Sequence, residues 1–344
     1  MFFRTAALNS PKSVSVIVPV FNASATLLPT LNSLLDQTLE NLEIIVVDDA
    51  STDSSSEIIK KLTAENKKII SLCFSENKGV HEARLAGIRR ASAPWIGFLD
   101  ADDFARPDMF ELMFNAATQK NVDITLCGSY RTNVQGKTIR KRTFFQKNER
   151  VDNKIFERFC RFEFGDGALW NKLYRSKLLK NLDFKSLPWR QNINEDLITN
   201  IGAFHKADSL YLMKDILHEY VENADSVTAK QNNSTAYINT FRAYALALRA
   251  YQHFDAESIF HITSMYRKQL DDSLYRVDDL KYLEEHYTAY LVEAIKEIEH
   301  IYPQGLGLLC CRSRDLSNLP IKLLARNLIK KIFTRIRMFS RRCS

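Results

Sequence analysis

The chain has 344 residues and a hydrophobic content of 45%, which is enough to bury a full core and to carry an additional segment. Its six cysteines include no Cys-x-x-Cys pair, which argues against a zinc site or a disulfide framework and favours a reducing cytoplasm. No window approaches the about twenty apolar residues of a membrane-spanning helix, and the apolar stretch in residues 1–8 is too short for a signal peptide.

The first hundred residues alternate short apolar runs with helical patterns. The apolar runs predict strands at 14–18, 42–47, 69–74 and 95–99. Helical periodicity fills the intervals and ends near Gln37, Asn66 and Ala91. Strands that alternate with helices of about ten to fifteen residues predict crossover units. The fold class is therefore α/β, with a mostly parallel sheet and helices on both of its faces.

Polar side chains follow three of the four predicted strands. They are Asn22 after the first strand, Asp48 and Asp49 after the second, and Asp100, Asp102 and Asp103 after the fourth. Open α/β sheets bind ligands at the carboxyl ends of their strands. Three carboxylates packed this closely repel one another, so they favour a cation, and oxygen ligands suit Mg²⁺ or Mn²⁺. For an Asp-x-Asp pattern alone, a solvated acidic turn is the alternative interpretation.

Three stretches resemble the signatures of family 2 glycosyltransferases. They are Ser-Val-Ile-Val-Pro-Val-Phe-Asn at 15–22, Ile-Ile-Val-Val-Asp-Asp-Ala-Ser-Thr-Asp at 44–53 and Phe-Leu-Asp-Ala-Asp-Asp at 98–103. The resemblance extends from residue 14 to about residue 228. It implies the GT-A fold, which has a Rossmann-like sheet, together with a nucleotide-sugar donor, a divalent metal and inversion at the anomeric carbon.

The same resemblance implies roles for residues that follow the first two strands. Pro19 and Phe21 would line the nucleoside pocket, with Asn22 beside them at the nucleotide-sugar site. Asp49 would accept a hydrogen bond from the uracil ring N–H, which is a contact that a carboxylate can make. Asp48 is adjacent and could share that task.

The resemblance also assigns the acidic loop after the fourth strand. Asp100 would lie near the ribose, and Asp102 would hold the metal ion, Mn²⁺ or Mg²⁺, that bridges the two phosphates. Asp103 would support the loop or the sugar. In some relatives a histidine further along the chain, after the residue that serves as catalytic base, is an additional ligand of the metal ion. His218 occupies a comparable place, where the family more often has an aromatic residue.

Asn194-Glu195-Asp196 opens an amphipathic segment and resembles the second acidic signature of the family. The resemblance implies that Asp196 is the base that deprotonates the acceptor hydroxyl and that Glu195 is its neighbour. Taken alone, two acids in the first turn of a helix can simply complement its dipole. Asp166 and Trp170 could contact the sugar or the acceptor, although Trp170 could equally be a buried core residue.

Past the base, apolar runs predict two short strands at 209–213 and 216–221. Residues 237–254 and 280–301 then show helical spacing without a strand pattern. We therefore divide the chain into a GT-A domain at 12–228, a helical appendage at 229–302 and a carboxyl-terminal segment at 303–344. The appendage could serve acceptor choice, self-association as a homo-oligomer or approach to a membrane.

The carboxyl-terminal segment carries the basic excess of the protein. Residues 321–344 hold eight Lys and Arg and no acid, so the rest of the chain has 48 − 8 = 40 basic and 41 acidic residues. Apolar residues share one face of a helix there, which predicts a basic amphipathic helix. Peripheral contact with an anionic membrane is one interpretation, and docking on the protein itself is the other. Nucleic acid is disfavoured because no binding motif accompanies the charge.

Together these features predict a metal-dependent, inverting hexosyltransferase. It would move a hexosyl unit from a UDP-sugar to a hydroxyl of a saccharide or lipid-linked acceptor. The setting would be cell-surface polysaccharide or lipopolysaccharide synthesis at the inner face of the cytoplasmic membrane. A sugar-1-phosphate nucleotidyltransferase is one alternative, but residues 15–25 contain no glycine for its phosphate loop. A catalytically inactive sugar-nucleotide-binding module is the other, although the acids of the site are all present.

Overall fold

The computed structural model of the protein describes residues 11–182, 187, 191, 193–222, 233–270, 295–296 and 299–300. The chain divides into two compact units. The first comprises Met1–Phe159, Glu163–Arg190 and Gly202–Ala224, and the second comprises Cys160–Phe162, Gln191–Ile201 and Asp225–Ser344. The predicted basic helix in 303–344 lies outside the described residues, and so does most of the predicted helix at 280–301.

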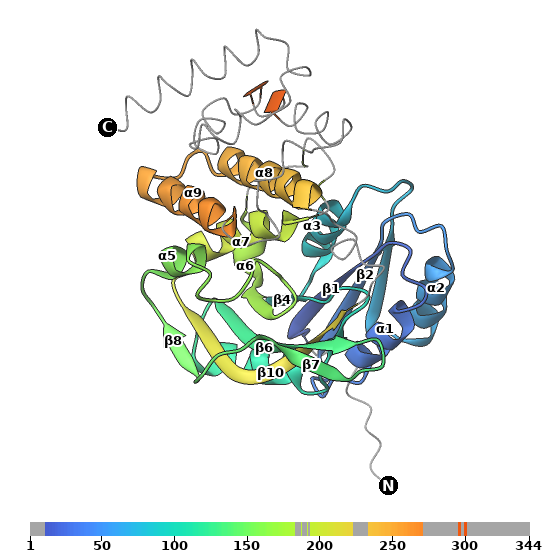
Figure 1. The fold of residues 1–344 in the computed structure, drawn as a ribbon. Helices are drawn as coiled ribbons and strands as arrows, with labels where there is room; N and C mark the ends of the chain where they lie inside the picture. Colours follow the sequence, from blue (N-terminus) through green and yellow to red (C-terminus); the bar gives the residue numbers. More distant parts are fainter. Residues whose placement is uncertain are drawn as a thin grey trace. The chain divides into compact units, whose positions relative to one another are not determined.

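The first half of the sheet is parallel, as the sequence predicts (Figure 1). Four strands pair in the order β3-β2-β1-β4: β1 (Val14–Val20), β2 (Leu42–Asp48), β3 (Ile69–Cys73) and β4 (Trp95–Phe98). The crossover helices are α1 (Leu27–Leu35), α2 (Ser55–Glu65) and α3 (Val80–Arg90). Every residue of β1 and β2 is buried. Because helices cover both faces of these strands, their sequences are almost continuously apolar.

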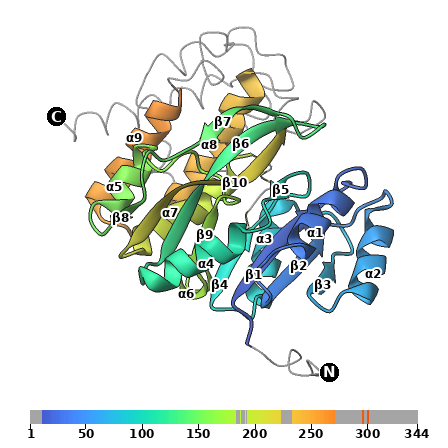
Figure 2. The same ribbon diagram turned by 90° about the horizontal axis from the view of Figure 1, so that it is seen from below.

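Beyond β4 the sheet is mixed, and its order continues β4-β9-β6-β10-β5 (Figure 2). These strands are β5 (Phe104–Ala105), β6 (Ile124–Asn133), β9 (Lys172–Arg175) and β10 (Leu210–Glu222). Strands β6 and β10 are parallel, whereas β9 runs antiparallel to β4 and β6. Among the described strands, β7 (Thr138–Thr143) pairs with β6 alone, and β8 (Glu149–Val151) pairs with β10.

The prediction of two separate strands at 209–213 and 216–221 was wrong. One strand, β10, spans both, and its register against β6 shifts between Leu212 and Ile216 and again between Ile216 and His218. The polar pair Lys214-Asp215 looks like a loop in the sequence, but in the structure it lies within β10 at an irregularity of the strand. A bulge changes the direction of the side chains that follow it, and here those side chains include His218.

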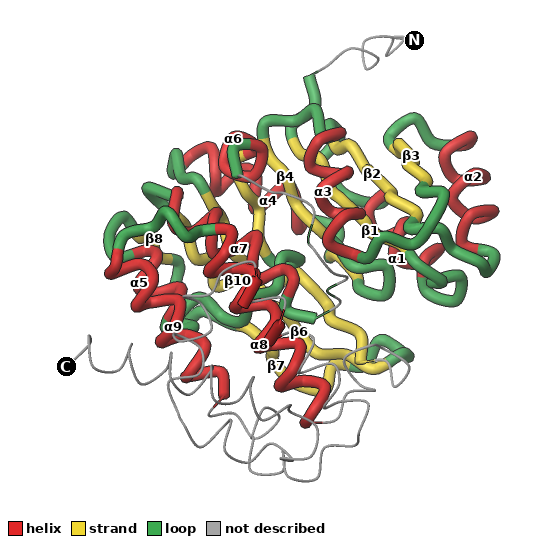
Figure 3. Tube along the Cα trace, turned by 90° about the horizontal axis from the view of Figure 1, so that it is seen from above, coloured by secondary structure: helices red, strands yellow, loops and turns green. Residues whose placement is uncertain are grey.

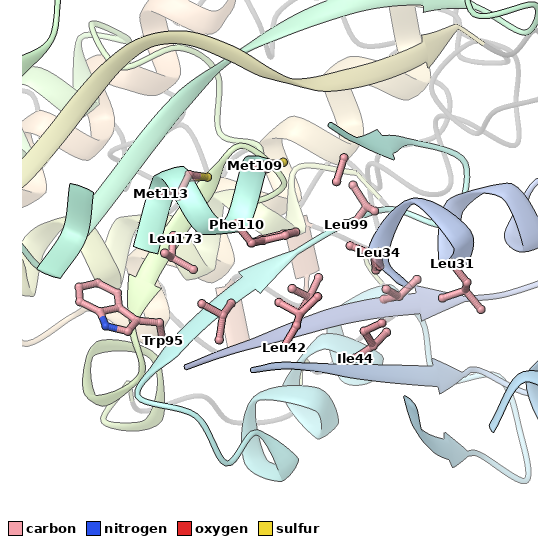
Figure 4. Packing of buried hydrophobic residues seen from close by; sticks show 14 of the residues in the cluster. Leu31, Leu34, Leu42, Ile44, Trp95, Leu99, Met109, Phe110, Met113 and Leu173 are labelled. Atoms are coloured by element: carbon pink, nitrogen blue, oxygen red, sulfur yellow. The ribbon is translucent and has the colours of Figure 1, made fainter. Parts of the chain in front are cut away.

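Helices cover both faces of the parallel half. Alternate residues of β1 and β2 join a core with α1 and α4 (Met109–Gln119), in which Figure 4 labels Leu31, Leu34, Leu42, Ile44, Met109 and Phe110. Ile17 of β1 points to the opposite face, because side chains alternate along a strand. A Cβ on Gly87 of α3 would stand 2.4 Å from Ile17 Cγ2. Glycine at position 87 therefore lets α3 lie directly on β1 (Figure 3).

The remaining helices are α5 (Ile155–Cys160), α6 (Ser176–Lys180), α7 (Glu195–Lys206), α8 (Asn233–Ala250) and α9 (Ala256–Leu270). Helices α8 and α9 belong to the second unit. The rings of Tyr244 and Tyr266 lie 5.0 Å apart between them, and Tyr244 Oη donates to Gln269 Oε1 at 2.9 Å. Within the described stretches, no helix has the length and apolar content that crossing a membrane requires.

Candidate active site

The loops after β1 and β2 are bound to each other by side chains of the predicted polar cluster. Asn22 adopts a left-handed conformation with φ +50°. Its Oδ1 accepts the backbone N–H of Thr52 at 2.8 Å, and its own N–H donates to Ser51 Oγ at 3.0 Å. Asp53 accepts the N–H of Ser24 at 3.0 Å. The two loops therefore form one connected edge at the carboxyl ends of their strands.

Asp48 and Asp49 are buried, and both already accept hydrogen bonds. Asp48 accepts the Ser56 hydroxyl at 2.5 Å, which closes the turn into α2. Asp49 accepts the backbone N–H groups of Lys78 and Gly79 at 2.7 and 2.8 Å, at the start of α3. Each carboxylate oxygen keeps a second lone pair. The contact between Asp49 and uracil therefore stays a prediction.

Pro19 and Phe21 lie at the carboxyl end of β1. Pro19 is buried in the strand, whereas Phe21 is 44% exposed. An exposed aromatic ring at this edge of the sheet offers a flat apolar surface on which a planar ligand can stack.

The acidic loop after β4 places its three carboxylates in different surroundings. Asp100 is partly exposed, and its Oδ1 lies 2.9 Å from Nη2 of Arg84, a residue of α3. Asp103 is fully buried, and its Oδ1 accepts the N–H of Val221 at 2.9 Å. Burial, together with the negative charges of Asp103 and Asp100, raises the pKa of Asp102 to about 7. Burial and the charge of Asp100 also raise the pKa of Asp103, so the repulsion expected from the sequence acts on Asp102 and Asp103.

Strand β10 brings His218 to this loop. His218 Nε2 lies 3.3 Å from Asp103 Oδ2, and His218 Nδ1 lies 3.0 Å from Ser129 Oγ. The imidazole stacks on the ring of Trp170, with 4.2 Å between the ring centroids. Burial lowers the pKa of His218 to about 3. The side chain is therefore neutral at physiological pH, which is the form that binds metals.

Asp103 Oδ2 and His218 Nε2 are buried and, although close, do not form a hydrogen bond. These two atoms lie near Asp102, whose carboxyl has a raised pKa. Mn²⁺ accepts both oxygen and nitrogen ligands, and Mg²⁺ prefers oxygen ligands, so atoms of these kinds suit either ion. In the part of the chain that the structure describes, no three His, Cys, Asp or Glu side chains form a ready metal shell. A divalent cation bound here would therefore take part of its ligands from outside these side chains.

Arg142 of β7 and Tyr220 of β10 extend this cluster, and no pattern in the sequence indicated either residue. The Arg142 guanidinium carbon lies 4.0 Å from the ring centroid of Tyr220 and 4.9 Å from that of Trp170. Its Nε and Nη2 donate to Asp166 Oδ2 at 3.2 and 2.9 Å. Burial opposes the ionisation of Asp166, but the charge of Arg142 holds the pKa of that carboxyl below its usual range. Trp170 is 4% exposed, so its ring is buried against His218 and Arg142.

Glu195 and Asp196 open α7 and belong to the second unit. Asn194, with φ +59°, precedes them, and its carbonyl accepts the first hydrogen bond of the helix. Asn194 Nδ2 donates to Thr240 Oγ1 of α8 at 2.9 Å. Tyr251 Oη donates to a backbone carbonyl of α7 at 2.8 Å. The predicted base is therefore attached to α8 and to the turn that follows it.

The sequence comparison decides the family. Residues 15–183 match the profile described as glycosyl transferase family 2. The chain belongs to glycosyl transferase family 2. The membership agrees with the three motifs and decides against the nucleotidyltransferase alternative.

Named relatives of this family 2 member include proteins of several bacteria. The chain is 29% identical to the uncharacterized glycosyltransferase EpsJ of Bacillus subtilis (strain 168), over 70% of each chain. It is 29% identical to the poly(ribitol-phosphate) beta-glucosyltransferase of Bacillus spizizenii, over 65% of this chain and 34% of that protein. The chain thus spans about a third of the length of the second relative.

The fold resembles that of S. aureus TarS residues 1–349, crystallised in complex with UDP-GlcNAc. The TM-score is 0.66, the sequence identity is 18%, and 89% of each chain is covered. The likeness establishes the GT-A fold of this family 2 member.

Proposed function

We propose that the protein is an inverting hexosyltransferase that uses a UDP-sugar as donor. The observation that carries the proposal is the grouping of Asp100, Asp102 and Asp103 at the carboxyl end of β4, with His218 beside them. Family membership supports transfer of a sugar. The structure of TarS with UDP-GlcNAc, a protein of the same fold, supports uridine as the nucleoside.

Asp102 would hold the divalent cation of the site, Mn²⁺ or Mg²⁺, with His218 as a second ligand, and Asp103 would support the loop. Such an ion supplies Lewis-acid neutralisation of the charge that develops on a departing nucleoside diphosphate. Asp100 would lie by the ribose, where its ion pair with Arg84 orients the carboxylate. Ser129 and Trp170 fix the imidazole of His218 by a hydrogen bond and by stacking.

The nucleoside would occupy the connected edge formed by the loops after β1 and β2. Phe21 supplies an exposed ring for the base, with Pro19 behind it in β1. Asp49 would accept the uracil N–H through a lone pair that its backbone hydrogen bonds leave available, and Asp48 holds the adjacent turn. Asn22 keeps the two loops together.

Asp196 would act as the general base. Its carboxylate takes the proton of the acceptor hydroxyl while that oxygen attacks the anomeric carbon, and the bond to the nucleoside diphosphate breaks on the opposite face. One displacement of this kind inverts the anomeric configuration. Glu195, which is 6% exposed, would support the base from the same helical turn. Asp166, fixed by Arg142, would orient a sugar hydroxyl, and Trp170 would back that subsite.

The acceptor would be a saccharide or a lipid-linked saccharide in the synthesis of a cell-surface polysaccharide or lipopolysaccharide. The relative named as a poly(ribitol-phosphate) beta-glucosyltransferase supports a polymeric acceptor. Sugar transfer would take place at the inner face of the cytoplasmic membrane. The basic amphipathic pattern of residues 321–344 supports that placement.

The test is release of UDP from a panel of UDP-sugars with Mn²⁺, with Mg²⁺ and with excess EDTA. We expect turnover with at least one sugar that EDTA abolishes and added metal restores. Asp102→Asn should lower turnover by at least about a hundredfold and remove the effect of metal on UDP binding. Asp36→Asn, at an exposed acid next to α1, is the matched control. Full activity of the wild type in EDTA would refute the metal assignment, and a preference for GDP over UDP would refute the uridine assignment.

A further inference from the structure

The hairpin of β6 and β7 combines two features that rarely occur together on a surface. Residues 124–148 contain six Lys and Arg and no Asp or Glu. The same stretch exposes three large apolar side chains: Val134 at 64%, Ile139 at 51% and Phe144 at 51%. We refer to Val134, Lys137, Ile139, Arg140, Lys141 and Phe144 as the hairpin surface.

Three of the six cations have partners inside the protein. Arg131 pairs with Glu222, Arg142 pairs with Asp166, and Lys147 lies 3.9 Å from Glu149. Lys137, Arg140 and Lys141 are exposed and have no carboxylate within ion-pair distance among the described residues. Lys141 Nζ lies 5.3 Å from the ring centroid of Phe144. The uncompensated cations and the exposed apolar groups thus lie on the same hairpin, and Lys141 lies directly beside Phe144.

Protection of a sheet edge explains only part of this composition. Of the strands that the structure describes, only β6 pairs with β7, and lysines on an edge strand discourage pairing with another chain. An edge protected in this way would not also expose Ile139 and Phe144, because apolar side chains favour the association that the charges oppose. A soluble polyanion would explain the cations but not the apolar groups. An anionic bilayer explains both, since its headgroups attract cations and its interface takes up apolar side chains.

We propose that the hairpin surface docks the protein on an anionic lipid membrane. Lys137, Arg140 and Lys141 would lie among the phosphate headgroups, while Ile139 and Phe144 would enter the interface. This contact is independent of the basic segment at 321–344. It also leaves Arg142, at the inner end of β7, in its bonds to Asp166.

The full-length protein is tested by flotation with vesicles of phosphatidylcholine, with and without phosphatidylglycerol. Lys137→Glu/Arg140→Glu/Lys141→Glu should weaken binding to the anionic vesicles by at least about a hundredfold, since each cation near such a surface contributes several-fold. Lys60→Glu/Lys61→Glu/Lys67→Glu makes the same change in net charge at exposed positions in α2 and just after it. The affinity of that control variant for the anionic vesicles should lie within about threefold of the wild-type affinity. Ile139→Ser/Phe144→Ser should remove the part of the binding that persists in high salt.

A local probe separates the hairpin from every other contact. Fluorescence of the Phe144→Trp variant should be quenched by brominated lipid in anionic vesicles. A Leu28→Trp variant, at an equally accessible apolar position of α1 that is 44% exposed, should not be quenched. Thermal unfolding verifies that each variant is folded.

Three results would overturn the proposal. Equal loss of binding in the two triple variants would mean that only net charge matters. Wild-type vesicle binding by the hairpin variant, without quenching in the Phe144→Trp variant, would place the contact elsewhere. Failure of the wild type to bind vesicles, combined with hairpin-dependent binding of soluble polyphosphate, would make the hairpin surface a polyanion site.

Discussion

At the scale of single residues, the candidate site depends on charged groups that hold one another in place. Arg142 is the clearest case, because its planar guanidinium lies against two aromatic rings and gives two hydrogen bonds to one carboxylate oxygen. A lysine carries the same charge but lacks the fork and the planar stacking surface. The geometry of the group, beyond its charge, therefore orients Asp166 and Trp170.

We predict that Arg142→Lys lowers the free energy of unfolding by about 1–3 kcal/mol, because the hydrogen bonds to Asp166 lose their geometry. Sugar transfer should fall at least about tenfold. Urea unfolding and initial rates measure the two effects. Arg140→Lys, on an exposed position of the same strand, should change neither quantity. If both substitutions behave alike, Arg142 has no special role at the site.

At the scale of elements, α8 links the helical part of the chain to the predicted base. Thr240 is fully buried, accepts a hydrogen bond from Asn194, and donates one to the Ala236 carbonyl. Asn194 is held in a left-handed conformation immediately before Glu195 and Asp196. The start of α7, and with it the predicted base, is thus attached to a helix that the sequence places in a separate appendage.

We predict that Thr240→Val lowers turnover by about tenfold while the dissociation constant for UDP stays unchanged. The substitution preserves shape and removes only the hydroxyl that holds Asn194. Thr263→Val of α9 is the matched control, because among the described residues that buried hydroxyl bonds only to carbonyls of its own helix. Steady-state kinetics and calorimetry distinguish the outcomes. Equal turnover in the two variants would show that α8 does not position the base.

At the scale of the whole molecule, buried ionisable groups make stability depend on pH. Burial, aided by the charges of Arg84 and Arg89, lowers the pKa of His81 from 6.5 to about 4. The unfolded chain therefore binds more protons than the folded chain between those two values. This contribution to stability is present above pH 6.5 and is lost as the pH falls toward 4. The raised pKa of Asp102 makes the folded state more stable at low pH, which opposes the effect of His81. The contribution of His81 is therefore measured by comparing the wild type with a variant that lacks this histidine.

We predict that His81→Gln makes the sheet-bearing unit less sensitive to acid. Between pH 7 and pH 5 the wild type should lose about 2 kcal/mol more of its unfolding free energy than the variant does. Urea unfolding at the two pH values measures this difference. His253→Gln, at an exposed position, is the control for the substitution itself. Parallel pH dependence in wild type and His81→Gln would show that His81 is not buried in its neutral form.

Local patterns in the sequence were sufficient to predict the parallel half of the fold and its acidic edge. Those elements have short-range causes: apolar runs of strand length, helical periodicity between them, and polar residues at the point where each strand ends. Because parallel strands share one carboxyl edge, order along the chain was enough to bring Asn22, Asp49 and Asp102 to the same side of the sheet.

The family resemblance named His218 and Asp166 as candidates, but the contacts that hold them depend on the folded chain. Arg142 and Asp166, His218 and Asp103, and Asn194 and Thr240 meet across 24, 115 and 46 residues of chain. Nothing in the local sequence around either partner specifies such a meeting. The antiparallel insertion of β9, the bulge in β10 and the packing of α8 create these contacts. Strand pairing and burial act between distant segments, so their result is visible only after the chain has folded.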